Sequence, residues 1–90
     1  MFIERDGGIR EDEWRRVVTA CSARFVDGTL DVELRDDDGS YRRVLRWEGS
    51  SAELSMMSFR SPFITQLEAI ARELGGKIID NDGALYFDAG

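Results

Sequence analysis

The chain has 90 residues, of which 18 are acidic and 12 are basic, so its formal net charge is −6. A chain of this length is expected to form a single domain over residues 1–90, because smaller pieces could not bury a core without disulfides or metals. The negative charge would repel a phosphate backbone, so no nucleic-acid partner is expected. Without histidine, the chain also lacks an imidazole base and an imidazole metal ligand.

Residue usage also indicates where the protein resides. The one cysteine cannot form an internal disulfide, and residues 1–6 lack the basic start and apolar run of a signal peptide. No apolar run approaches the length of a membrane span. These features predict a cytoplasmic protein without a membrane partner.

A short strand and a helix are predicted at the start of the chain. Residues 1–5 have strand character, and a glycine pair at 7–8 interrupts them. Glu11, Asp12 and Glu13 then favour a helix start, because carboxylates are stabilised near the positive end of the helix dipole. The apolar stripe of this helix has helical spacing and consists of Trp14, Val17, Val18 and Cys21.

A hairpin is predicted between residues 30 and 48, where apolar and charged residues alternate. Its turn is either a two-residue loop, Asp38-Gly39, or a four-residue loop, 36–39. Both loops place the same residues of the two strands on the same face of the hairpin. The residues expected on one face are Leu30, Val32, Leu34, Tyr41, Arg43, Leu45 and Trp47. On the opposite face, the acidic residues of the first strand are expected to pair with Arg42 and Arg46.

The second half of the chain contains the best-formed helix, from Ser61 to Gly76. Ser61 is expected to be the N-cap, with Pro62 at the first helical position, and the glycine pair 75–76 ends the helix. A third strand of the meander, 52–59, precedes it. A closing hairpin follows, with strands at 77–80 and 84–87 around an Asn-Asp-Gly turn.

The predicted element order is β-α-β-β-β-α-β-β, an antiparallel sheet meander with two helices. Each helix has one apolar face, so both are expected to cover the same side of the sheet. The fold class is therefore α+β, a two-layer sandwich.

Few residues suggest chemistry. Asp36, Asp38 and Gly39 match part of a calcium-binding loop, but leucines stand at its first and last ligand positions, so a hairpin turn is preferred. A second acidic cluster, also interpreted as belonging to a turn, consists of Asp80, Asp82 and Asp88. The single cysteine lies on an apolar stripe and is interpreted as a core residue. We therefore expect no catalytic residue, no metal site and no cofactor.

Arg43 interrupts the apolar face that Leu45 and Trp47 are expected to share. Two interpretations of this arginine are open. It could anchor an acidic ligand, or its guanidinium could reach solvent at a sheet edge and pair with a carboxylate, which is the more common arrangement.

The chain contains four short motifs: Glu13-Trp14 in the early helix, residues 70–75 as a late helix ending, Asn81-Asp82-Gly83, and Tyr86. Together they resemble a group of small uncharacterised bacterial proteins. Members of that group are similar in an early acidic residue and tryptophan, and in a late helix ending followed by a DDG turn and a tyrosine. Here Asn81 stands where that turn has its first aspartate. The resemblance implies a bacterial, cytosolic, single-domain protein and no catalytic residues.

The leading hypothesis is a non-enzymatic protein-interaction module, immunity-like or regulatory, with a basic protein as its partner. The expected contact residues are Glu11, Asp12, Glu13, Arg43 and Trp47. The alternative is a small-ligand binding or sensory domain that uses the open sheet face around Arg43 and Trp47. A monomer and a homodimer through a strand edge are compatible with both hypotheses.

Overall fold

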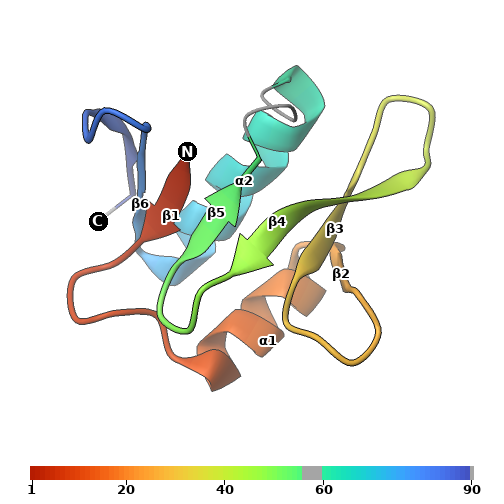
Figure 1. Ribbon diagram of the computed structural model, residues 1–90, viewed down its shortest axis with the longest axis horizontal. Coiled ribbons are helices and arrows are strands. Elements are labelled where there is room, and N and C mark those ends of the chain that lie inside the picture. The colour runs from red at the N-terminus through yellow and green to blue at the C-terminus, as the bar shows by residue number, and fades with distance from the viewer. Residues whose placement is uncertain (56–59, 90) are drawn as a thin grey trace.

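The computed structural model describes residues 1–55 and 60–89. The elements in chain order are β1 (Phe2–Glu4), α1 (Glu11–Ala20), β2 (Arg24–Phe25), β3 (Val32–Arg35), β4 (Tyr41–Trp47), β5 (Ala52–Leu54), α2 (Ser61–Leu74), β6 (Lys77–Ile79) and β7 (Leu85–Asp88). The strands form one open antiparallel sheet, and the helices cover one of its faces (Figure 1). The predicted α+β two-layer fold is confirmed, with the short strand β2 as an addition.

Strand β1 lies in the interior of the sheet, whose order is β2-β3-β4-β5-β1-β6-β7. Ile3 pairs with Ala52 of β5 on one side and with Ile78 of β6 on the other. All three side chains are fully buried. The first strand therefore joins the β2–β5 meander to the closing β6–β7 hairpin.

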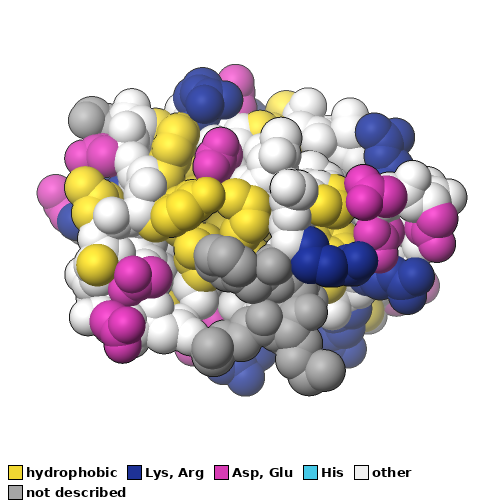
Figure 2. Space-filling view, turned by 90° about the horizontal axis from the view of Figure 1, so that it is seen from above, with side chains coloured by type: hydrophobic (Ala, Val, Ile, Leu, Met, Phe, Trp, Pro, Cys, Tyr) yellow, Lys and Arg dark blue, Asp and Glu magenta, His cyan; other side chains and the backbone are white. Residues whose placement is uncertain are grey.

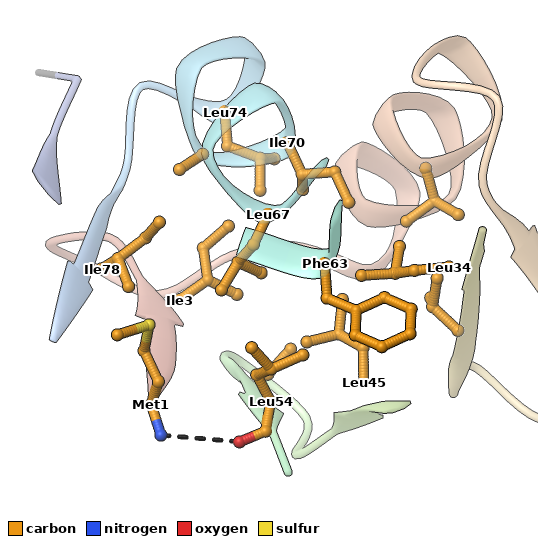
Figure 3. Close-up of a cluster of buried hydrophobic side chains, with 14 of the residues drawn as sticks. Met1, Ile3, Leu34, Leu45, Leu54, Phe63, Leu67, Ile70, Leu74 and Ile78 are labelled. Carbon is orange, nitrogen blue, oxygen red and sulfur yellow. Dashed lines mark hydrogen bonds between the residues drawn. The ribbon is translucent and has the colours of Figure 1, made fainter. Parts of the chain in front are cut away.

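The hydrophobic core fills the space between the sheet and the two helices (Figure 3). Helix α2 contributes its buried face, which consists of Phe63, Ile64, Leu67, Ile70, Ala71 and Leu74. Helix α1 contributes Trp14, whose ring is fully buried and whose Nε1–H donates to the Leu30 carbonyl at 3.0 Å. Burial of these apolar faces is the main stabilising contribution to the fold.

The β3–β4 hairpin differs from both predicted loops. Its loop spans residues 36–40, because Arg35 pairs with Tyr41. This odd loop length shifts the pairing by one residue, so the residues of β4 near the turn lie on the face opposite to the predicted one. A bulge between Val32 and Glu33 then restores the predicted face, so that Val32 pairs with Leu45 as expected. Both Val44 and Leu45 are consequently buried. Arg43 pairs with Glu33 and therefore lies on the open face, opposite to the predicted one.

The ends of α2 are close to those predicted, with two corrections. Arg60 is the N-cap residue and makes no side-chain cap hydrogen bond, while Ser61 is already helical. At the other end, Gly75 adopts the left-handed conformation with φ 64°. Gly76 serves a different purpose, because a Cβ atom there would lie 2.8 Å from the Glu4 carbonyl oxygen.

Two further predictions concern segments around α2. The strand expected at 52–59 is found as β5, and its predicted remainder at 56–59 lies outside the described residues. The closing turn is confirmed by hydrogen bonds from Asp80 N–H to the Ala84 carbonyl and from Gly83 N–H to the Asp80 carbonyl.

Among the described residues, no helix is long and apolar enough to cross a membrane.

The contact between Gly76 and Glu4 predicts that Gly76→Ala weakens the pairing of β1. The added methyl group must displace the β1 backbone, which costs about 1–3 kcal/mol in well-packed regions. The control is Gly75→Ala, which meets no atom within 4 Å and costs about 1–2 kcal/mol through its left-handed backbone alone. Chemical denaturation measures the loss of unfolding free energy in each variant, and amide hydrogen exchange shows which residues are affected. Only Gly76→Ala is expected to speed exchange at Ile3, and unchanged exchange there would contradict the assignment.

Candidate functional site

The acidic start of α1 is largely neutralised within the chain. Glu13 forms two hydrogen bonds with the Arg5 guanidinium, one of them Nη1 to Oε2 at 2.8 Å, and the side chain is 15% exposed. The hydrogen bond from Arg5 lowers the pKa of Glu13 to about 2. Glu11 lies 3.5 Å from Arg15, and Asp12 lies 3.6 Å from Arg10. The three predicted contact carboxylates are therefore all paired, although Glu11 and Asp12 remain exposed.

Arg43 and Trp47 lie on opposite faces of β4. The Arg43 guanidinium pairs with Asp31 Oδ2 at 2.6 Å on the open face. The Trp47 ring stacks on Trp14 of α1, with ring centroids 5.0 Å apart, and packs against the core. Asp31 connects the two residues, because its Oδ1 accepts the Trp47 backbone N–H at 2.9 Å. Pairing of this arginine with a carboxylate agrees with the more common of the two interpretations.

A hollow of about 380 Å³ lies beside Arg43 on the open face. Its lining includes Arg43, Arg46, Asp31 and Glu53. The two arginines are already engaged, Arg43 by Asp31 and Arg46 by Glu53 at 2.9 Å. An acidic ligand would have to displace these carboxylates, so the hollow is poorly suited to the small-ligand alternative.

Asp36 is the buried polar centre at the turn end of the β3–β4 hairpin. Its side chain is 7% exposed, and its Oδ2 accepts hydrogen bonds from Arg42 Nε and Arg60 Nη2, each at 2.7 Å. Its Oδ1 accepts the Asp37 backbone N–H at 2.8 Å. The hydrogen bonds from Arg60, the Asp37 N–H and Arg42, in this order of effect, lower the pKa of Asp36 to about 2. This carboxylate thus ties the hairpin to the residue that precedes α2.

The same contacts explain why this turn does not resemble a calcium site. Asp36 is enclosed by two guanidinium groups, and Asp38 accepts hydrogen bonds from the Ser40 hydroxyl and backbone N–H. Cationic and N–H donors occupy the oxygens that a metal ion would need. In the parts of the chain that the structure describes, no three His, Cys, Asp or Glu residues come together to hold a metal ion.

At the turn of the β6–β7 hairpin, Asp80 and Asp82 flank Asn81, whose Oδ1 accepts a hydrogen bond from the N-terminal ammonium of Met1 at 2.6 Å. Asp80 Oδ1 accepts the backbone N–H groups of Asp82 and Ala84, each at 2.9 Å, which agrees with its predicted turn role. None of the ion pairs found among the described residues includes Asp80 or Asp82. Acidic and hydrophobic side chains lie next to one another at the left end of Figure 2, where Figure 1 places this hairpin.

Two large hydrophobic side chains are exposed on this hairpin. Leu85 is 58% exposed and Tyr86 is 47% exposed, and they are the exposed large hydrophobic residues of the described chain. Leu85 pairs with Ile79, and Ile79 pairs with Phe2, so these side chains form an apolar row across the open face from β1 to β7. The row ends at the sheet edge. This apolar edge beside two carboxylates without ion-pair partners is the best candidate for a contact surface.

Sequence reasoning identified the turn of this hairpin and missed its exposed residues. A bulge between Ile78 and Ile79 leaves Tyr86 without a β6 partner and sets the faces of the residues around it. Nothing in the alternation of residues 84–87 indicates the bulge. The edge position of β7 depends on the placement of β1, a long-range pairing that local patterns do not report.

The Asp36 contacts predict an acid-dependent loss of stability. The pKa of Asp36 in the folded protein, about 2, lies below its ordinary value of 3.8. The contribution of this carboxylate to the free energy of unfolding is therefore complete at pH values above 3.8 and is lost as the pH falls toward 2. Asp36→Asn is expected to be less stable than the wild type at neutral pH, with a gap that narrows across this range. Urea denaturation at a series of pH values measures the gap. Asp37→Asn, which removes the same charge from an exposed neighbour, is the control, and a gap independent of pH would contradict the assignment.

Comparison of the chain with protein-family models, with curated proteins and with solved structures finds no match. The case for a function therefore depends on the residues of this chain and their geometry.

Proposed function

We propose that this protein is a non-enzymatic protein-interaction module, immunity-like or regulatory, that binds a basic protein. Its contact surface is the hairpin surface, which we define as Asp80, Asp82, Leu85 and Tyr86. The observation that supports the proposal is the exposed apolar area of Leu85 and Tyr86 beside Asp80 and Asp82, neither of which is in an ion pair found among the described residues. Interfaces commonly combine a central apolar contact with a charged rim that attracts the partner.

The hairpin surface has more support than the acidic start of α1. Glu13 is held by Arg5, and the exposed carboxylates beside it have arginines nearby. The tryptophans offer little to a partner, because Trp14 is fully buried and Trp47 stacks against it. The small-ligand alternative loses support for a related reason, since Arg43 and Trp47 do not share a face.

We further propose that the protein works in the cytoplasm as a monomer until it meets its partner. The free thiol of Cys21 suits a reducing compartment, and burial raises the pKa of this thiol, which makes it a poor nucleophile. The net charge of −6 opposes self-association and favours a partner of opposite sign.

Two variants of equal charge test the proposal. Asp80→Asn/Asp82→Asn removes two charges from the hairpin surface and keeps the Oδ1 acceptor of the turn. Glu11→Gln/Asp12→Asn removes two exposed charges from the start of α1. Each protein is immobilised and exposed to lysate of the source cells at low and at high salt, and captured proteins are identified by mass spectrometry.

The wild type and the α1 variant are expected to retain the same basic protein at low salt and to release it at high salt. The hairpin variant is expected to retain on the order of tenfold less, because local charge complementarity is lost. Equal losses in the two variants would indicate an effect of total charge only. Full retention by the hairpin variant would contradict the proposed surface.

A further inference from the structure

The two edges of the sheet differ in how well they are protected from pairing with another chain. At one edge, β2 has only two residues and carries Arg24, whose guanidinium pairs with Glu33. At the other edge, β7 has four residues, among them the exposed Leu85 and Tyr86. Lysine, proline, other charges and bulges are common means of protecting an edge. Strand β7 has no lysine or proline; its one charged residue, Asp88, lies at its end, and its bulge is at Tyr86.

We propose that β7 accepts an extended segment of a basic partner protein as an additional strand of the sheet. The inference rests on the proposed function and specifies how the partner binds. An edge strand supplies backbone hydrogen bonds to an incoming segment, and the side chains beside it select the sequence. In the described chain β7 pairs with β6 alone in the sheet, which leaves the outer edge of residues 85–87 for this role.

The surroundings of β7 define the side chains that fit. On the open face, the row formed by Phe2, Ile79 and Leu85 would continue into the incoming strand, so an apolar residue fits opposite Leu85. At the turn end of β7, Asp80 and Asp82 favour lysine or arginine. The preferred segment therefore alternates apolar and basic residues, as expected for a strand with one face on an apolar row.

A second copy of this chain fits the edge less well. In antiparallel pairing of two β7 strands, the end of each strand lies beside the turn of the other. Both copies carry a net charge of −6, and the turn carboxylates Asp80 and Asp82 of each would lie close to the other acidic chain. Like charges placed opposite one another disfavour strand pairing. The charge distribution thus favours a basic partner over a homodimer.

The test uses two end-blocked peptides of about eight residues, a typical strand length. One alternates valine and lysine, and the other alternates valine and glutamate. Each is titrated into the isotope-labelled full chain, and NMR reports chemical shifts and amide exchange along β7. The lysine peptide is expected to shift residues 84–88 and to slow exchange of β7 amides at least severalfold. The glutamate peptide is expected to leave them unchanged.

Two variants separate strand addition from simple charge attraction. Tyr86→Pro removes a backbone N–H at the bulge, where proline is tolerated, and is expected to abolish the slowed exchange. Leu85→Lys keeps every backbone group and repels the lysine peptide, so it provides the same test if the proline variant does not fold. Spectra of β1 and α2 report whether each variant retains the fold.

The outcomes separate this inference from the proposed function. Slowed exchange in the wild type and its loss in both folded variants would support strand addition. Binding that persists in both variants but fails in Asp80→Asn/Asp82→Asn would overturn strand addition and leave the interaction function standing. No response of β7 to the lysine peptide would overturn the inference. Protection of β7 that rises with protein concentration in the absence of peptide would overturn it in favour of self-association.

Discussion

The placement of β1 between β5 and β6 is the constraint on which the rest of the structure depends. Without it, the β2–β5 meander and the β6–β7 hairpin would share no strand pairing in the described sheet. Arg5, directly after β1, extends the connection, because its guanidinium bonds to Glu13 of α1 and to the Leu74 carbonyl at the end of α2. The first residues of the chain thus hold together the sheet and the ends of both helices, and they leave β7 at the edge.

Internal pairing of charges explains why the candidate surface is small. Arg5 neutralises the most enclosed carboxylate of α1, and Asp36 is held between Arg42 and Arg60. The open face carries further pairs, such as Arg43 with Asp31. With the other ion pairs of the described residues, eight arginines are engaged within the fold: Arg5, Arg10, Arg15, Arg24, Arg42, Arg43, Arg46 and Arg60. The hairpin surface remains as the place where exposed apolar area and carboxylates without ion-pair partners coincide.

Local patterns predicted much of the fold and little of the site. The helices follow from apolar spacing, and the closing turn follows from Asn81-Asp82-Gly83, because both signals depend on neighbouring residues. The two bulges and the interior place of β1 depend on packing between distant segments. For this reason the alternation of residues predicts the wrong face for Arg43. The exposure of Leu85 and Tyr86 could not be predicted without knowing that β7 forms an edge.

The most direct test of this account is amide hydrogen exchange in the free protein at two protein concentrations. The account predicts strong protection of Ile3 and Ile78 in the interior of the sheet. It also predicts that β7 amides not bonded to β6 exchange quickly at both concentrations, since an open edge leaves them in water. Protection of every β7 amide to the level of Ile3 would show that the edge is already covered and would contradict the account.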